Sequence, residues 1–277
     1  MIRNTIIISL LLLLSFKSLG QINDSLVSRQ WNIEVGYQNF RILDKNVSPL
    51  IYIANNGELS FRFQKTGEKY LWNIGGGVSI GSNQSKRFGQ RSAVVYDHYD
   101  IYGNRDSTVY NINPGLSFIQ ASLFYSYYWK LNTEKKKMYV GGIIKDNFYY
   151  GALGADTWFF NQLSISPSFR MKLFSFNKFK IDAEFSTPIF SYLLRQPYTL
   201  DPSLPVNSYF KAYLKTGSEF ATINQFQQVN INIKFAYELN SGNQIGLSYY
   251  FMWMNYANIP DRNLNAFSNS ILISYTF

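Results

Sequence analysis

The sequence contains no cysteine, a single histidine and, beyond residues 1–20, no apolar run long enough to cross a membrane as a helix. Disulfides are therefore excluded, so a chain of this size outside the cytoplasm needs another device to hold its fold, and a closed β-barrel is one. Charged residues make up only 16% of the chain, whereas aromatic residues make up 18%, more than a soluble core needs. The formal charge of +9 comes from scattered residues, so no nucleic-acid partner is expected.

The N-terminus has the pattern of a secretory signal peptide. Arg3 gives a positive start, residues 6–14 are apolar, and Ser18 and Gly20 are small residues before a cleavage site. The apolar run is too short to span a bilayer, and no cysteine follows it, which excludes a lipoprotein anchor. We expect residues 1–20 to be removed and residues 21–277 to form one domain.

The chain ends in a strand with a strict period of two. Ile271, Ile273, Tyr275 and Phe277 share one face, and mostly polar residues share the other. This ending resembles the closing strand of Gram-negative outer-membrane β-barrels, which finish on Phe with apolar residues at every second position before it. The resemblance implies an all-β fold, a transmembrane antiparallel up-and-down β-barrel in the cell outer membrane. It also implies that the outer-membrane barrel assembly machinery recognises the C-terminal strand.

The same alternation recurs along the chain and predicts about ten strands, or twelve if a long segment holds a hairpin. The connections alternate between short turns and long loops, the longest being residues 83–114 and 191–224, which is typical of an outer-membrane barrel with both termini in the periplasm. Pro167 interrupts one strand and predicts a bulge there. The expected strands cover residues 31–38, 58–64, 70–80, 119–130, 138–147, 162–173, 179–189, 228–239, 245–254 and 269–277.

The composition of the two strand faces predicts that the apolar face contacts lipid. The polar face consists mostly of Ser, Asn, Gln and Gly, which fill a lumen better than they coat a soluble protein. The apolar face becomes aromatic at the ends expected on the periplasmic side, as in the belts that anchor barrels at head-group level. The expected belt consists of Trp31, Tyr70, Trp72, Tyr127, Trp129, Tyr237, Tyr275 and Phe277.

The polar face also carries charges of both signs that are expected to point into the lumen. They can cross-link and fill a narrow barrel. The alternative is a small porin-like channel whose selectivity they set. A filled lumen is favoured, because open aqueous channels usually need more strands. The expected lumen charges are Glu34, Glu58, Arg62, Lys130, Arg170, Lys172, Lys180, Asp182, Glu184, Lys234 and Glu238.

The single histidine, His98, lies between Asp97 and Asp100 in the second outer loop, where it could act as a base. Omptin proteases resemble this chain in size and strand number, but their Asp and His residues come from several strand ends. Outer-membrane phospholipases are similar in length, but they need a Ser two residues after the His, where this chain has Asp100. No catalytic residue is assigned, and a rim hydrolase using His98 is the last of three hypotheses. No metal or cofactor site is predicted.

The remaining candidates are the outer loops. Residues 195–205 contain three prolines and the aromatic Tyr198, typical of a loop that binds a partner or caps the barrel. Lys86, Arg87 and Arg91 either contact lipid phosphates or are solvated. The expected partners are outer-membrane lipid including lipopolysaccharide, the assembly machinery and an extracellular partner. The leading hypothesis is a non-enzymatic barrel that binds a partner or adheres through its loops, or supports the membrane.

Overall fold

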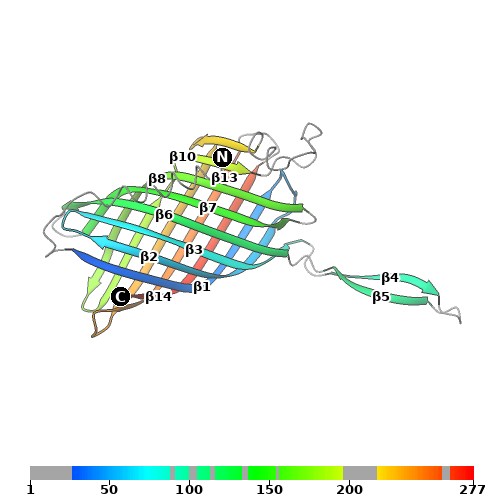
Figure 1. Cartoon of the computed structure of the whole chain (residues 1–277), viewed down its shortest axis with the longest axis horizontal. Coiled ribbons are helices and arrows are strands. Elements are labelled where there is room, and N and C mark those ends of the chain that lie inside the picture. The colour runs from blue at the N-terminus through cyan, green and yellow to red at the C-terminus, as the bar shows by residue number, and fades with distance from the viewer. Residues whose placement is uncertain are drawn as a thin grey trace, which may run out of the picture.

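The computed structural model describes residues 27–87, 91–99, 105–112, 116–132, 137–153, 156–195, 217–257 and 263–277. They form a closed antiparallel barrel of ten strands and a separate two-stranded hairpin (Figure 1). The strands are β1 Ser28–Asp44, β2 Tyr52–Thr66, β3 Tyr70–Ser85, β4 Arg91–Tyr99, β5 Arg105–Ile112, β6 Leu116–Asn132, β7 Lys137–Leu153, β8 Asp156–Phe176, β9 Phe179–Ser186, β10 Phe190–Arg195, β11 Ser218–Thr222, β12 Phe226–Glu238, β13 Gln244–Tyr256 and β14 Leu264–Thr276.

The expected barrel of ten strands is confirmed. β9 and β10 are two parts of one barrel strand, because both pair with β8. β11 and β12 are likewise two parts of the next strand, since they pair with β10 and β9 in turn. The C-terminal strand closes the barrel on β1: the amide of Phe277 donates to the Trp31 carbonyl at 2.9 Å, and the amide of Trp31 donates back at 2.8 Å.

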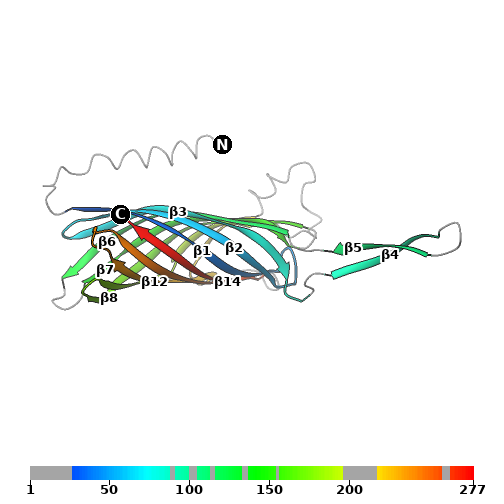
Figure 2. The same ribbon diagram turned by 90° about the horizontal axis from the view of Figure 1, so that it is seen from below.

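Two segments expected to be loops contain strands. Residues 83–114 hold β4 and β5, which pair with each other and lie outside the barrel wall, beyond one end of the barrel (Figures 1 and 2). β-branched and aromatic residues within this polar stretch, such as Val94, Val95 and Tyr110, favour strand formation. Residues 191–224 hold most of β10 and all of β11, which extend the barrel wall. The hairpin therefore raises the strand total without adding to the barrel.

The bulge expected at Pro167 lies in the neighbouring strand. β7 pairs with β8 straight through Pro167, opposite Gly142. On the other side of β8, Ser168 pairs with Ser186 and Ile165 pairs with Phe190, so the neighbouring strand has one residue more than β8 between these two pairs. Pro167 has no amide hydrogen to donate, and the extra residue in the partner strand relieves the ladder there.

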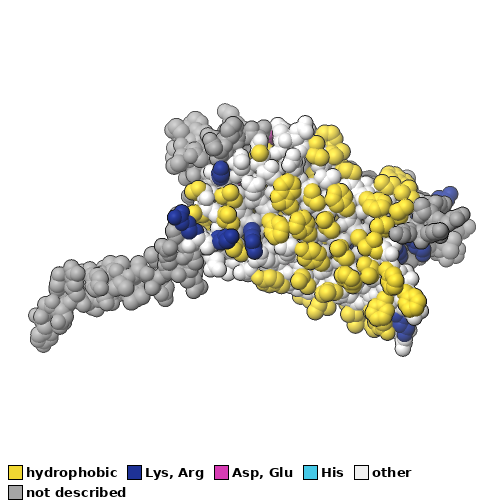
Figure 3. Space-filling view, turned by 180° about the vertical axis from the view of Figure 1, so that it is seen from behind, with side chains coloured by type: hydrophobic (Ala, Val, Ile, Leu, Met, Phe, Trp, Pro, Cys, Tyr) yellow, Lys and Arg dark blue, Asp and Glu magenta, His cyan; other side chains and the backbone are white. Residues whose placement is uncertain are grey.

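The apolar face of the strands points outward and the polar face inward, as expected. Ile33, Val35 and Ile273 are about half exposed, while the alternating Glu34 and Ser274 are buried. Apolar side chains cover most of the barrel surface seen in Figure 3. Lipid favours this arrangement because closure pairs every strand and no backbone group is left without a partner.

The strands are longer than a membrane requires. β1 has 17 residues, which at about 3.3 Å per residue and a tilt near 40° rise by roughly 43 Å, well above the apolar band of about 25 Å. At the outer end of β1 the polarity of the faces reverses: Asn39 and Arg41 point outward, while Phe40 and Ile42 are buried inside. The barrel therefore extends beyond the membrane and has a soluble-type core in this part.

Adjacent glycines in β7 provide a test of how closely β6 and β7 approach. A Cβ on Gly141 would lie 1.9 Å from the Tyr127 carbonyl oxygen, a backbone atom that cannot turn away, whereas a Cβ on Gly142 would lie 3.6 Å from its nearest neighbour. We expect Gly141→Ala to lower the free energy of unfolding by about 1–3 kcal/mol and Gly142→Ala to change it by less than about 0.5 kcal/mol. Urea unfolding in detergent measures both, and equal effects would contradict this packing.

Candidate functional site

Glu34 is the centre of the polar part of the lumen. This β1 carboxylate is 2% exposed and accepts hydrogen bonds from the hydroxyls of Ser248 at 2.9 Å, Ser60 at 3.2 Å and Tyr250 at 2.7 Å. Arg62 on β2 donates to the Tyr250 hydroxyl at 3.1 Å. Three strands are thus joined across the interior, and Arg62 is held in mid-lumen by a hydroxyl that itself donates to a carboxylate.

A second group of charges lies nearer the end of the barrel with the short turns. Arg170 on β8 donates to Asp182 on β9 at 3.3 Å and to Gln64 on β2 at 3.1 Å. Lys234 on β12 donates to the Asn32 side-chain oxygen at 2.8 Å. These contacts join strands on opposite sides of the barrel, which supports the predicted cross-linked interior.

The polar part of the lumen holds two cavities that share Arg62 in their lining. A cavity of about 160 Å³ lies on one side of Arg62 and includes Glu58, Lys145 and Glu184 in its lining. A cavity of about 220 Å³ lies on the other side and includes Arg170 and Lys234. Arg62 lines both cavities, so its side chain stands between them.

The structure places the predicted lumen charges on the inward-facing register positions of their strands. Lys180 and Glu238 form an ion pair at 2.5 Å near the short turns, and Lys172 lines the cavity of about 220 Å³. Lys130 lies near the C-terminal end of β6, paired in register with Tyr139. Sequence reasoning missed Lys145, because the Gly and Ile pairs before it blur the period of β7. It also missed Asp44 and Arg195, because both were assigned to loops.

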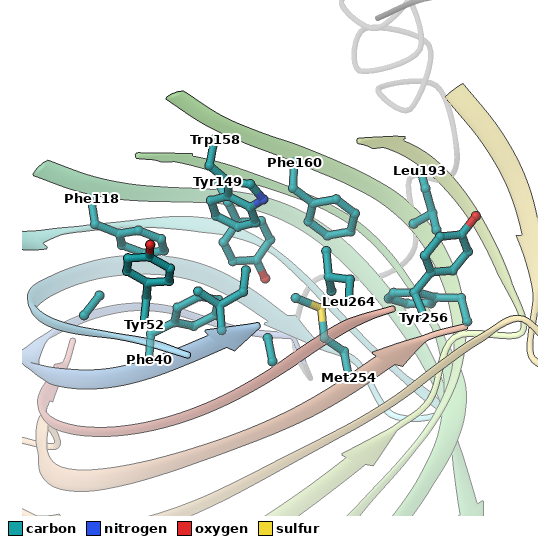
Figure 4. Close-up of a cluster of buried hydrophobic side chains, with 14 of the residues drawn as sticks. Phe40, Tyr52, Phe118, Tyr149, Trp158, Phe160, Leu193, Met254, Tyr256 and Leu264 are labelled. Carbon is teal, nitrogen blue, oxygen red and sulfur yellow. The ribbon is translucent and has the colours of Figure 1, made fainter. Parts of the chain in front are cut away.

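An aromatic and apolar cluster fills the outer part of the lumen (Figure 4). The Phe40 ring lies 5.0 Å from that of Phe118 and 5.5 Å from that of Tyr149, and Trp158 continues the stack 6.0 Å from Phe118. Ten labelled side chains of this cluster point toward one another from strands around the barrel in Figure 4. Sequence reasoning missed this cluster; the signal was the even-numbered positions of β1, which change from polar to apolar after Gln38.

A buried ion pair lies at the outer ends of the strands, against this cluster. The Arg195 guanidinium donates two hydrogen bonds to the Asp44 carboxylate, at 2.5 and 3.2 Å, and the Trp158 indole donates a third at 2.8 Å. Arg195 also lies over the Tyr256 ring at 5.5 Å, and the Tyr256 hydroxyl donates to Glu219. Burial raises the pKa of the Glu219 carboxyl, and the nearby Arg195 opposes that rise.

The predicted interface aromatics lie together at the end of the barrel with the short turns. Trp31 and Phe63 have ring centroids 4.9 Å apart, and Tyr127 and Trp129 are 5.0 Å apart. Tyr70 stacks 6.2 Å from Tyr127. The other members make ring contacts of the same kind: Trp72 with Phe63, Tyr237 with Phe179, and Tyr275 with Phe277.

The hydrolase candidates are not brought to the barrel rim. Asp97 and His98 lie in β4, where His98 pairs in register with Asp106 of β5, and Asp100 lies outside the described residues. The described part of the chain has no group of three or more His, Asp or Glu that could hold a metal ion. Nor does any helix in that part have the length and apolar character needed to cross a membrane.

Comparison with solved structures finds outer-membrane proteins of low sequence identity. The outer-membrane protease OmpT from Escherichia coli matches with a TM-score of 0.51 at 7% identity, over 94% of this chain and 99% of that chain. The β-domain of the Bordetella autotransporter BrkA matches at 0.40 and 8% identity, over 90% and 98%. Neisserial surface protein A matches at 0.33 and 10% identity, over 90% and 97%.

Sequence comparison adds no closer relative: no family model and no curated protein matches the chain. At such identities the structural likeness establishes the fold alone. The chain is a ten-stranded β-barrel of the Gram-negative outer-membrane type, and this fold places it in the cell outer membrane.

Proposed function

We propose that this protein is a non-conducting outer-membrane barrel that displays the β4–β5 hairpin to a partner outside the cell. The observation that carries the proposal is the position of the hairpin. It extends beyond the end of the barrel opposite the C-terminus (Figure 2), and among the described residues its two strands pair only with each other. The barrel would serve as its rigid, membrane-anchored support.

The interior supports the non-conducting part of the proposal. An ion that enters the lumen from the outer end would meet the aromatic cluster first and Arg62 second. The side chains of the cluster come from barrel strands, and each of these strands is paired with a neighbour on both sides. The cluster therefore cannot leave the lumen in the way that a loop folded into a barrel can. A small porin-like channel therefore has less support than display of the hairpin.

The hairpin supports recognition by strand addition. A two-stranded sheet has two edges whose backbone donors and acceptors point away from each other, and such edges accept an additional strand from another chain. An isolated hairpin is only marginally stable in water, so a third strand would stabilise it. The partner class that fits is an extended polypeptide segment.

The test separates the two parts of the proposal. In planar bilayers the purified protein should give no conductance steps. Cells producing a variant with residues 88–115 replaced by a short Gly-Ser turn should lose most of their adherence to immobilised extracellular proteins and to one another. A matched control carries a Gly-Ser insertion after Gly242, in a turn between β12 and β13, and should adhere like the wild type. Conductance by the wild type, or unchanged adherence of the hairpin variant, would overturn the proposal.

Two further partners belong to this proposal. The barrel assembly machinery would read the C-terminal strand, whose outward face carries Ile271, Ile273 and Tyr275. Lipopolysaccharide would surround the outer half of the barrel. Neither role depends on the hairpin, so the hairpin-less variant is expected to assemble and to show the heat-modifiable mobility of a folded barrel.

A further inference from the structure

Four exposed basic residues gather at the outer ends of β1 and β3. Arg41 points outward from β1, Lys45 follows the end of that strand, and Lys86 and Arg87 follow the end of β3. Arg41 pairs in register with Ile53, and Ile53 pairs with Gln84, two residues before Lys86. Arg41 and Lys86 are thus two strands apart, about 12 Å by strand geometry. We call Arg41, Lys45, Lys86 and Arg87 the basic patch.

Among the described residues, no carboxylate pairs with Arg41, Lys45 or Lys86 on the outer surface. Between residues 27 and 87, the only acidic residue at this end of the barrel is Asp44, which points inward, is fully buried and is bound by Arg195. Among the described residues, Lys45 and Lys86 have no acidic partner. The Arg41 guanidinium donates through Nε to the Asn39 side chain at 3.3 Å, a neutral partner. Within the part of the chain that the structure describes, the charges of Arg41, Lys45 and Lys86 are therefore not offset.

The basic patch lies just beyond the apolar band. On β1 the outward side chains change from Val35 and Tyr37 to Asn39 and then Arg41. The Tyr37 hydroxyl and the Asn39 amide both donate to the Asn55 side-chain oxygen, at 2.5 and 2.9 Å, and form a polar girdle between the band and the patch. In Figure 3, several Lys and Arg side chains lie toward the left end of the face shown, beside the main yellow surface. In a barrel whose apolar band lies in the membrane, we expect this level to coincide with the lipid head groups of the outer leaflet.

We propose that the basic patch binds the phosphate groups of lipopolysaccharide, at its lipid A portion. Phosphates accept strong charge-assisted hydrogen bonds from Arg and attract Lys as a point charge. The apolar side chains directly below contact acyl chains, so one amphiphile would contact both surfaces. An acidic protein would match the charge but not the adjoining apolar band. The inference rests on the proposed placement of the barrel among lipopolysaccharide and adds the residues that hold it.

Native mass spectrometry of the detergent-solubilised barrel with purified lipid A tests the site. The wild type should bind bisphosphorylated lipid A at least about tenfold more tightly than lipid A dephosphorylated by a phosphatase, because each basic residue near lipid phosphates contributes substantially to attraction. The variant Arg41→Gln/Lys45→Gln/Lys86→Gln should bind both forms with the weaker affinity. The double variant Lys45→Gln/Lys86→Gln keeps the Arg41–Asn39 bond and should show an intermediate preference.

The matched control is Lys65→Gln/Lys69→Gln/Lys178→Gln, which removes the same charge near the periplasmic turns and should keep the wild-type preference. No preference for phosphorylated lipid A in the wild type would overturn the inference, as would an unchanged preference in the triple patch variant. If the patch and control variants lost the preference for phosphorylated lipid A equally, the overall positive charge and not a specific site would attract the lipid. That result would also overturn the inference. None of these variants touches the lumen or the hairpin, so conductance and adherence report on the proposed function separately.

Discussion

Asp44→Ala is expected to lower the free energy of unfolding by about 3–5 kcal/mol, one of the largest single-residue effects in the molecule. The substitution leaves the Arg195 guanidinium buried with no carboxylate, and removing one partner of a buried ion pair typically costs this much. The Trp158 indole also loses its acceptor. Urea unfolding of the refolded barrel, followed by tryptophan fluorescence, measures the loss.

The double variant Asp44→Leu/Arg195→Met tests whether the loss of stability in Asp44→Ala comes from leaving the Arg195 charge buried without a carboxylate. It removes both charges and keeps apolar bulk beside the aromatic cluster, so its loss should be clearly smaller than that of Asp44→Ala. Exposed Glu68→Ala, in the turn before β3, is the control and should change stability by less than about 0.5 kcal/mol. An Asp44→Ala loss no greater than that of Glu68→Ala would contradict the description of the pair as a buried structural contact.

The barrel was predictable from the sequence because each strand carries its own evidence. A period of two puts Ile33 and Val35 on one side of β1 and Glu34 on the other, whatever the rest of the chain does. Membrane placement adds the constraint that the apolar side faces out. The ends of β14 and β1 could be joined because closure leaves no unpaired edge in lipid.

The outer part of the lumen was not predictable in the same way. Outside the membrane, apolar side chains are buried inside the barrel and polar ones face water. Phe40 and Gln38 both point inward and occupy the same alternating positions, so the period of two does not distinguish a polar lumen from an apolar one. The polarity of the inward side chains changes where the strand leaves the membrane. The sequence of a single strand does not show at which residue this happens. Asp44 and Arg195 are 151 residues apart, and their pairing depends on the staggering of ten strands.

The lumen is expected to open only when both of its barriers are removed. The variant Phe40→Ala/Phe118→Ala/Tyr149→Ala shortens three stacked side chains of the aromatic cluster but leaves the Trp158–Asp44 bond in place. Arg62→Ala removes the side chain between the two polar cavities. Each change alone should leave planar bilayers silent, because the other barrier still lies in series with it.

Combining the four substitutions should produce resolved conductance steps from a protein that otherwise gives none. Losing three aromatic side chains costs several kcal/mol, so heat-modifiable mobility must first show that the variant is folded. The control combines Arg62→Ala with Phe148→Ala, Phe185→Ala and Phe251→Ala, which removes three rings from the outward face, and it should remain silent. Steps from Arg62→Ala alone would mean that the aromatic cluster does not close the lumen. Silence from the combined variant would mean that the closure extends beyond these four side chains.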